Sequence, residues 1–369
     1  MGQEIERVAE AIRAFERGEI VVVTDDDDRE NEGDLFIAAS HCTAEKMAFI
    51  IRHTSGIVCA PLTPDIARRL RLDPMVSSND ALQGTAFTVS VDFRHGLTTG
   101  ISAEERTATV RGLANGNAGP ADFVRPGHVF PLIARDGGVL MRSGHTEACI
   151  DLCKLAGHDP VGVLSELVND DGTVMRGPQV AAFAGEHNLA SVSVADLIAY
   201  RQRSERLVER LDSFSIETAY GPAEVITYGT SFDPMHHLAL VFGDIRDGHN
   251  LPVRLQLEEV AEDVFGSTGR IDRVLKKIAD HGRGVIVYLR EGAVGVARSG
   301  ARTREGLTGD EDHDTAQARG EEWREIGLGA QILNDLGVQS ICLIASRERH
   351  YVGLSGFGIV IEETEIFDA

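Results

Sequence analysis

The stretch Thr24-Asp-Asp-Asp-Asp-Arg-Glu-Asn-Glu-Gly-Asp34 separates two apolar runs, which cover residues 20–23 and 35–39. Each run is short and apolar, which predicts a buried strand. The stretch between them carries seven carboxylates and one arginine. Such a loop repels itself unless a cation neutralises it, so we expect a bound metal or a cationic partner. A solvated acidic turn is the usual state of a charge run. The position at strand ends, with Gly33 breaking the run, favours a site instead.

An EF-hand calcium loop is the nearest local alternative for this acidic stretch. If the loop started at Asp28, the acidic residues at alternate positions and Gly33 would fit. The twelfth position would then be Ala39, where a calcium loop needs a bidentate glutamate. The EF-hand interpretation therefore fails.

The composition is that of a globular protein with two domains. The chain has 369 residues, of which 43% are hydrophobic. A net charge of −22 argues against non-specific nucleic-acid binding and against anionic membrane surfaces. No apolar run approaches the roughly 20 residues of a transmembrane helix, the N-terminus lacks the features of a signal peptide, and the cysteines have no paired spacing. We therefore expect a cytoplasmic protein with no nucleic-acid partner and no membrane partner.

Helical and strand patterns mix along the first half without strict alternation. This mixture predicts an α/β fold of α+β character, built on a mixed sheet with helical layers rather than on a doubly wound parallel sheet. The expected helices cover residues 4–17, 43–53, 102–114, 148–155 and 180–187, with a further one from 63. The expected strands cover residues 20–23, 35–39, 56–60, 85–91, 161–168 and 190–194.

The domain boundary is expected in or just after a charged helix over residues 195–211. This divides the chain into domains 1–203 and 204–369. The second half begins with strands of antiparallel appearance near 223–228, 238–242 and 253–257. It continues with a helix at 271–281, a strand at 285–289, a helix at 315–336 and a strand at 338–344. Residues 297–314 have little periodicity and predict a mobile loop.

Two histidines stand in turns that a glycine opens. His145 lies where a helix is about to begin, and free amides at a helix N-terminus bind anions. Arg142 adds positive charge there, so a phosphate group is the expected ligand. His145 could also bind a metal, although a histidine at a helix start is more often a cap or a surface residue. His128 precedes an apolar strand, and an ordinary turn histidine is an equally good interpretation.

Glu166 interrupts the apolar stretch over residues 161–168. A buried carboxylate must be paired or must have a raised pKa, which makes it a candidate general acid or base. A strand-end glutamate that reaches water is an equally good interpretation. By default Cys59, Cys149 and Cys153 are buried apolar residues. No nucleophile elbow, P-loop or dinucleotide fingerprint is present.

Six blocks of the first half together resemble 3,4-dihydroxy-2-butanone 4-phosphate synthase of riboflavin biosynthesis. In order they are DDDDRENEGD at 25–34, HTSGIVC at 53–59, TTGISA at 98–103, RPGHVFPL at 125–132, RSGHTEA at 142–148 and LSELVNDDGT at 164–173. The resemblance covers roughly residues 5–201, and six such blocks do not match by chance. It implies the synthase half, a mixed-sheet α/β sandwich, of the two-domain proteins that join this enzyme to GTP cyclohydrolase II.

This family converts D-ribulose 5-phosphate to 3,4-dihydroxy-2-butanone 4-phosphate and formate. The resemblance implies magnesium or manganese, two ions per active site, with Glu30 and His145 as metal ligands. It implies a homodimer with the active site near the interface, across which His128 could act. The implied catalytic residues are Glu166, His128, Glu32, Asp34 and Cys59. The implied substrate-binding residues are Arg29, Glu30, Asp34, Arg142, Ser143, Gly144, His145, Thr146 and Glu166.

The chemistry of this reaction agrees with these residue types. Protons must move on and off carbons beside a carbonyl, water must leave, and one carbon must be expelled as formate. Each intermediate resembles an enediolate anion, which divalent cations held by Glu30 and His145 would stabilise. Carboxylates at Glu32, Asp34 and Glu166 could move protons at different pKa values.

The second half resembles GTP cyclohydrolase II but departs from it at the metal site. The family's three zinc-binding cysteines correspond to Glu259, Arg270 and Asp272, and the only cysteine of this half is Cys342. Apolar frame segments survive, such as GLGAQIL at 327–333. The pattern predicts a folded domain that binds no zinc and has no cyclohydrolase activity.

Three interpretations of the whole chain follow from the two resemblances. The first is a synthase whose cyclohydrolase-like domain is catalytically inactive. The second is a bifunctional enzyme whose cyclohydrolase half uses an unrecognised site. The third makes the C-terminal half a regulatory module that binds a nucleotide or a partner protein.

Overall fold

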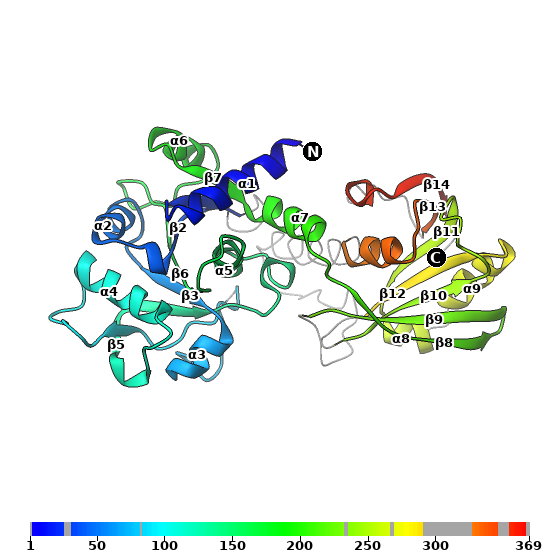
Figure 1. The fold of residues 1–369 in the computed structure, drawn as a ribbon, viewed down its shortest axis with the longest axis horizontal. Coiled ribbons are helices and arrows are strands. Elements are labelled where there is room, and N and C mark those ends of the chain that lie inside the picture. Colours follow the sequence, from blue (N-terminus) through cyan, green and yellow to red (C-terminus); the bar gives the residue numbers. More distant parts are fainter. Residues whose placement is uncertain are drawn as a thin grey trace, which may run out of the picture. The chain divides into compact units, whose positions relative to one another are not determined.

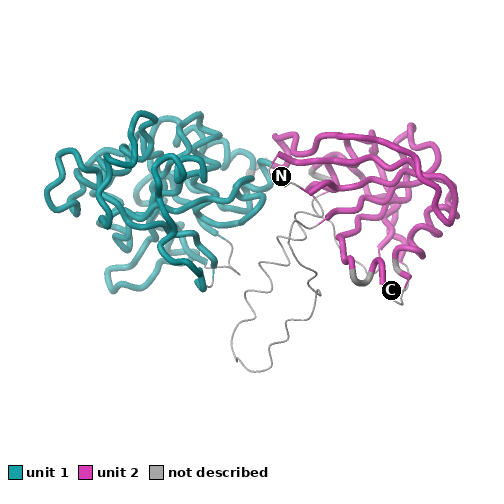
Figure 2. Tube along the Cα trace, turned by 90° about the horizontal axis from the view of Figure 1, so that it is seen from below, with its two compact units in different colours: residues 1–201 teal, residues 202–369 magenta. Residues whose placement is uncertain are grey.

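The chain folds into two compact units, Met1–Arg201 and Gln202–Ala369, in a computed structural model (Figure 2). The structure describes residues 2–25, 31–81, 83–231, 235–265, 269–290, 327–345 and 354–366. Each unit contains a seven-stranded sheet with both parallel and antiparallel neighbours, and helices pack on it. The predicted α/β fold on mixed sheets is therefore confirmed. Among the described residues, no helix is long and apolar enough to cross a membrane.

The sheet of the first unit has the strand order β4-β5-β3-β6-β2-β1-β7. Its strands are β1 (Val21–Thr24), β2 (Gly33–Ala38), β3 (Cys59–Leu62), β4 (Val91–Phe93), β5 (Phe123–Ile133), β6 (Gly162–Glu166) and β7 (Ala190–Ser193). The pairs β3–β5 and β1–β7 are parallel, and the other neighbouring pairs are antiparallel. The acidic stretch therefore joins the two strands of an antiparallel hairpin, β1 and β2.

Seven α-helices accompany this sheet in the described part of the first unit (Figure 1). They are α1 (Gly2–Glu16), α2 (Ala44–His53), α3 (Pro64–Leu70), α4 (Ala103–Ala114), α5 (His145–Leu155), α6 (Pro178–Glu186) and α7 (Val194–Ser204). The short 3-10 helices are η1 (Ala39–His41), η2 (Pro120–Asp122) and η3 (Gly138–Leu140). Thr43 and Ser102 cap the starts of α2 and α4, because Thr43 accepts a hydrogen bond from the Lys46 amide and Ser102 accepts one from the Glu105 amide.

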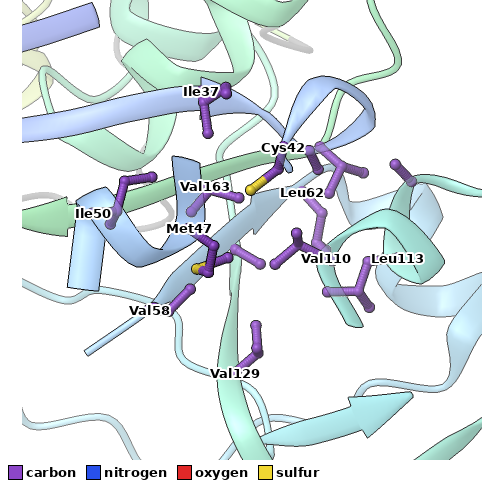
Figure 3. Packing of buried hydrophobic residues seen from close by; sticks show 14 of the residues in the cluster. Ile37, Cys42, Met47, Ile50, Val58, Leu62, Val110, Leu113, Val129 and Val163 are labelled. Carbon is purple, nitrogen blue, oxygen red and sulfur yellow. The ribbon is translucent and has the colours of Figure 1, made fainter. Parts of the chain in front are cut away.

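Alternate residues of β2 face opposite sides of the sheet. Leu35 and Ile37 belong to the main core, together with Met47 of α2 and Val110 of α4 (Figure 3). Side chains alternate along a strand, so Asp34 and its neighbours of the same parity face the other side. The structure thus separates an apolar face from a face that carries polar groups.

Helix α5 covers that other face, where it packs against β2, β3 and β6 (Figure 1). The Phe36 ring meets the His145 imidazole edge-on, with ring centroids 5.9 Å apart. Cys149 and Cys153 are fully buried within the same helix, as expected for core residues. The start of α5 is therefore held against the side of β2 that Asp34 shares.

The sheet of the second unit has the strand order β14-β13-β11-β12-β10-β9-β8. Its strands are β8 (Glu209–Thr218), β9 (Gly221–Gly229), β10 (His237–Phe242), β11 (Leu251–Leu257), β12 (Gly284–Leu289), β13 (Ser340–Ala345) and β14 (Val360–Ile366). The helical elements are α8 (Val260–Phe265), α9 (Arg270–Asp280), the helical residues 327–335 and η4 (Leu354–Phe357). Val274 and Ile278 of α9 pack against Ile286 in a core of their own.

Several elements differ from the sequence expectations. The strand expected over residues 85–91 is reduced to isolated bridges at Phe87 and Thr88, and β4 begins only at Val91. The charged helix expected over 195–211 ends at Ser204, and the chain enters β8 at Glu209. The residues from Glu209 form a strand because they pair with β9, and this sheet formation outweighs the local helical pattern.

The strand expected near 253–257 is present as β11 but is parallel to both of its neighbours, β12 and β13. Its sequence had an antiparallel appearance because short apolar runs do not reveal strand direction. Strands β8 and β14 and helix α8 were not expected at all. The predicted mobile loop at 297–314 and the first part of the helix expected at 315–336 lie outside the described residues.

Candidate active site

The sheet register brings four of the expected site residues to one face and one end of the first sheet. Asp34 on β2 lies directly opposite Glu166 on β6. Cys59 on β3 lies opposite Leu164, two residues before Glu166 and therefore on the same face. On the other side, Cys59 pairs with Phe130 of β5, whose same-face neighbour is His128. This is the face that α5 covers.

His145 and Asp34, an expected metal ligand and an expected catalytic residue, lie close together. His145 Nδ1 lies 4.0 Å from Asp34 Oδ2, and the two side chains are only 9% and 2% exposed. His145 is the first residue of α5, with Gly144 as the N-cap residue. A largely buried imidazole thus faces a largely buried carboxylate at a helix N-terminus.

Hydrogen bonds close the base of the acidic loop. The Glu32 amide donates to Asp25 Oδ1 at 2.9 Å, and the Asp25 amide donates to the Glu32 carbonyl at 3.3 Å. The Glu32 carboxylate lies 3.8 Å from Arg176 Nη2. Arg29 and Glu30 lie outside the described residues, so their roles in substrate and metal binding stay predictions.

Glu166 is the last residue of β6, and its side chain is partly exposed. Of the two interpretations of this glutamate, its position agrees with the strand-end one. Its Oε2 accepts a hydrogen bond from Ser55 Oγ at 2.7 Å, and its carbonyl accepts one from the Ser55 amide at 2.8 Å. The Ser55 hydroxyl thus fixes a carboxylate that still reaches open space.

Cys59 is buried at the start of β3 and is only 2% exposed. Burial raises the pKa of its thiol far above the usual range, and the nearby charges of Glu166 and Asp34 raise it further. The thiol therefore stays protonated at neutral pH, when it is a poor nucleophile. Any catalytic role of Cys59 remains a prediction, and its position is that of a side chain lining the site.

His128 lies within strand β5 rather than in a turn, so the turn interpretation of its sequence is wrong. Its Nδ1 is 2.8 Å from Asp92 Oδ2, and its amide donates to Asp92 Oδ1 at 2.8 Å. The imidazole is 40% exposed, while the Asp92 side chain is 5% exposed. A buried carboxylate therefore holds a ring whose other side is open.

The Arg142 side chain is fixed by three partners. Its Nη1 donates to Glu147 Oε2 at 2.6 Å, and its Nη2 donates to Thr85 Oγ1 at 3.0 Å and to the Gln83 carbonyl at 3.1 Å. The Glu147 side chain is almost completely buried in the first turn of α5. A guanidinium is thus held beside a helix N-terminus, an arrangement suited to a phosphate group.

The remaining residues of this loop complete the N-terminus of α5. Ser143 is partly exposed, and Thr146 is buried within the first helical turn. A Cβ on Gly144 would lie 2.4 Å from Arg142 Nη1 and 3.0 Å from Glu147 Oε2. The absence of a side chain at Gly144 therefore lets the Arg142–Glu147 pair lie across the helix start.

Sequence reasoning did not identify the residues that hold the expected ones in place. These residues are Ser55, Thr85, Asp92 and Glu147. Ser55 and Glu147 lie inside the six sequence blocks that resemble the synthase family, so their place in those blocks could have marked them as site residues. Thr85 and Asp92 lie outside those blocks, and only the folded chain brings them to Arg142 and His128.

Among the described residues, no three histidine, cysteine, aspartate or glutamate side chains gather into a metal site. The pair of Asp34 and His145 still offers a carboxylate oxygen and an imidazole nitrogen, which are ligands that Mg²⁺ and Mn²⁺ accept. Mg²⁺ usually takes only one or two carboxylates from a protein and completes its shell with water and substrate oxygens. The partly buried, oxygen-rich end of β2 and β6 therefore suits such an ion.

In the second unit, two of the residues that replace the zinc-binding cysteines, Glu259 and Asp272, form ordinary polar contacts. The Glu259 amide donates to Asp263 Oδ2 at 2.9 Å, and Asp272 Oδ2 accepts from the Tyr220 hydroxyl at 2.8 Å. Arg270 is the first residue of α9. Cys342 is buried in β13. No thiolate cluster for zinc can form from residues 202–369, since they contain one cysteine.

The fold and the site are those of a two-domain α/β enzyme. Comparison with known protein families finds a match for each of the two domains. A profile of 3,4-dihydroxy-2-butanone 4-phosphate synthase matches residues 9–200, and a profile of GTP cyclohydrolase II matches residues 209–365. The bifunctional riboflavin biosynthesis protein RIBA 1 of Arabidopsis thaliana, described as chloroplastic, is 46% identical. The alignment covers 96% of this chain and 67% of that protein.

Two solved structures are also similar. RibBX of A. baumannii, described as a two-domain 3,4-dihydroxy-2-butanone 4-phosphate synthase, has a TM-score of 0.82 at 37% identity, covering 98% of this chain and 100% of that one. A 3,4-dihydroxy-2-butanone 4-phosphate synthase in complex with two magnesium ions has a TM-score of 0.52 at 47% identity, covering 53% of this chain and 97% of that one. The chain belongs to the 3,4-dihydroxy-2-butanone 4-phosphate synthase family of enzymes, fused to a GTP cyclohydrolase II family domain.

The Arg142 contacts predict the effect of Gly144→Ala. The new methyl group would displace the flexible Arg142 side chain, while the backbone at Gly144 (φ −115°) accepts alanine without strain. Losing a hydrogen bond to a charged group costs about 1.5–3 kcal/mol. We expect kcat/KM of the synthase reaction to fall about 10- to 100-fold. Tm should fall as well, because the buried Glu147 carboxylate loses its ion pair with Arg142.

Gly185→Ala is the matched control for this variant. A Cβ at Gly185 of α6 meets nothing within 4 Å, so activity should be unchanged. Steady-state kinetics and thermal unfolding of both variants check the prediction. Unchanged kcat/KM in Gly144→Ala would show that the Arg142 position does not matter for the reaction.

Proposed function

We propose that the chain converts D-ribulose 5-phosphate to 3,4-dihydroxy-2-butanone 4-phosphate and formate, a carbon–carbon lyase reaction of riboflavin biosynthesis. The observation that carries the proposal is the pairing of Asp34 with Glu166 beside His145 at the start of α5. Two carboxylates and an imidazole meet there next to a helix N-terminus and a fixed arginine. Membership of the synthase family supports the same reaction.

The phosphate of the substrate would bind at the start of α5. The amides of the first helical turn, over His145 and Thr146, carry the positive end of the helix dipole. Arg142 supplies a full positive charge, and hydrogen bonds to Glu147 and Thr85 hold its planar guanidinium group in one position. With the phosphate anchored there, the sugar carbons would extend over the strand ends toward Asp34 and Glu166.

The carboxylates would move the protons that the reaction requires. Glu166 is fixed by the Ser55 hydroxyl and reaches open space, so it can take a proton from a substrate carbon and return it to another. Asp34 and Glu32 can transfer protons at neighbouring atoms of the substrate, because their burial and their partners differ from those of Glu166. Ser143 and Gly144 would contact the phosphate through their backbone, and Cys59 would line the cavity without ionising.

Glu30 and His145 would hold the metal ions, either Mg²⁺ or Mn²⁺, and Arg29 would assist substrate binding. When bound, the ions would supply positive charge to the oxygens of enediolate-like intermediates. The similar synthase in complex with two magnesium ions supports a two-ion site. His145 would combine this role with its place at the helix start, where its Nδ1 lies 4.0 Å from the Asp34 carboxylate.

We propose a synthase domain over residues 1–203 and an inactive cyclohydrolase-like domain over residues 204–369. The loss of all three zinc cysteines supports inactivity, since zinc activates the attacking water in cyclohydrolase chemistry. RibBX, described as a two-domain synthase, supports the same division of labour. The family match and the name of the Arabidopsis relative instead favour a bifunctional enzyme. A regulatory module that binds a nucleotide or partner is the third candidate.

The proposal includes the assembly and the location of the enzyme. We propose a homodimer whose active site lies near the interface, where the exposed His128 ring could act. We propose a cytoplasmic enzyme, although the Arabidopsis relative is described as chloroplastic. The net charge of −22 supports the expectation of no nucleic-acid and no membrane partner.

Metal removal tests the proposed reaction. Full-length protein with Mg²⁺ should release one formate per ribulose 5-phosphate, and excess EDTA should abolish release. Glu30→Ala should reduce kcat at least about 100-fold, since it removes a ligand that organises charge in the transition state. Glu10→Ala, on the exposed side of α1, is the matched control and should retain full activity. Formate release that does not depend on metal, or the absence of any formate release, would contradict the proposal.

Zinc content and GTP turnover decide between the interpretations of the C-terminal half. The inactive domain predicts less than stoichiometric zinc by elemental analysis and no formate from GTP, with or without added zinc. Stoichiometric zinc together with GTP-dependent formate would establish the bifunctional enzyme. Saturable GTP binding without turnover, measured by calorimetry, would favour the regulatory module.

A further inference from the structure

Asp92 and His128 are joined by a two-point contact between neighbouring strands. The His128 amide donates to Asp92 Oδ1 at 2.8 Å, and His128 Nδ1 lies 2.8 Å from Asp92 Oδ2. Asp92 is on β4 and His128 is on the neighbouring strand β5. A carboxylate that accepts from both the backbone and the ring of one histidine fixes the position and the rotation of that ring.

The chemistry of the two groups assigns the proton between them. An ionised carboxylate can only accept hydrogen bonds, so Nδ1 of His128 must be the donor. A neutral imidazole carries one proton, which leaves Nε2 with a lone pair. The ring is 40% exposed and the carboxylate only 5% exposed, so the open part of the pair is the imidazole.

One further side chain, that of Arg106, acts on Asp92. Arg106 of α4 is buried and attracts Asp92 electrostatically, and its Nη1 donates to the Gly56 carbonyl at 2.9 Å. Gly56 belongs to the same turn as Ser55, the residue that fixes Glu166. The Asp92–His128 pair is thus tied through Arg106 to the part of the site that holds the other proton-transfer candidate.

The loop through Gly100 closes over the pair. A Cβ at Gly100 would lie 2.1 Å from Asp92 Oδ2 and 2.7 Å from His128 Nδ1. The backbone of Gly100 has φ +85°, which a side chain rarely adopts. Glu105 accepts hydrogen bonds from the Thr98 amide and hydroxyl, and these bonds lower the pKa of its carboxyl to about 2. The loop is therefore held in place while it covers the bond between Asp92 and His128.

We propose that Asp92 is the positioning residue of His128, which it holds in the Nδ1–H tautomer so that Nε2 serves as a proton acceptor in the synthase reaction. This inference rests on the proposed function. When Nε2 accepts a proton from the substrate, the Asp92 carboxylate stabilises the imidazolium, and the same proton leaves Nε2 later in the cycle. Asp92 itself does not touch the substrate.

Asp92→Asn separates positioning from a merely structural role. The asparagine carbonyl can still accept from the His128 amide, but its NH₂ group would now face Nδ1 as a donor. The ring should then move its proton to Nε2, although the shape of the contact is kept. We expect kcat to fall roughly 100- to 10,000-fold, the range of general acid–base catalysis, with a much smaller change in KM.

Histidine ¹⁵N NMR gives a readout that does not depend on turnover. In the full-length protein labelled at histidine, the His128 ring should show the Nδ1–H tautomer, and Asp92→Asn should switch it to Nε2–H. His128→Gln assigns the signals. An Nε2–H tautomer in the unmodified protein, or an unchanged kcat in Asp92→Asn with a switched tautomer, would overturn the inference. If the unmodified protein releases no formate, the proposed function fails, while the NMR spectrum still reports the tautomer.

Asp122→Asn is the matched control, because it changes the same chemistry elsewhere. Asp122 accepts from the Gly119 amide at 2.8 Å and contacts His95 Nε2 at 2.8 Å, but His95 is an exposed residue outside the site. This variant should keep its kcat, because neither partner lies in the site. An equal loss of kcat in both variants would contradict a specific role for Asp92.

Gly100→Ala tests the pair from the loop side if Asp92→Asn does not fold. The added methyl group pushes on both partners but leaves the carboxylate and the imidazole in the protein. Gly96→Ala is its control, because Gly96 has a similar φ of +77° and open space around its Cβ position. We expect at least a tenfold lower kcat in Gly100→Ala than in Gly96→Ala. Equal kcat values would contradict the inference.

Discussion

The antiparallel register between β2 and β6 is the constraint on which the site depends. It sets Asp34 directly opposite Glu166 and turns both toward the face covered by α5. A slip of β2 by one residue would move Asp34 to the apolar face and place Leu35 where the acid now lies. The register is secured by burial, because Leu35 and Ile37 fill the main core. The residues that stabilise the fold thus also align the chemistry.

Much of this arrangement could be predicted from the sequence because it is local. The hairpin around the acidic stretch, the N-caps at Thr43 and Ser102 and the helix start at His145 all follow from short patterns. The contacts that fix the functional side chains are not local. Arg142 meets Thr85 across 57 positions, and His128 meets Asp92 across 36. No pattern in one sequence reveals such pairs, since only strand order and loop paths create them.

The second unit keeps a complete sheet and core although the zinc cysteines are absent. Apolar residues of β12 and α9 pack together, and polar groups form hydrogen bonds, such as that from the Tyr220 hydroxyl to Asp272. Arg254, for example, donates to Gln256 Oε1 and to the Ile344 carbonyl inside the sheet. Burial and hydrogen bonding stabilise a fold whether or not a metal site survives. Retention of the fold in this half therefore carries no information about activity.

We propose that the catalytic metal binds at the strand ends of the first unit. Anomalous diffraction at the manganese edge, from crystals grown with Mn²⁺ and ribulose 5-phosphate, would locate the metal. We expect manganese within coordination distance of His145, beside Asp34 and Glu166, and none bound by residues 202–369. Manganese bound only in the second unit, or at the first sheet without His145 as a ligand, would show that this proposal is wrong.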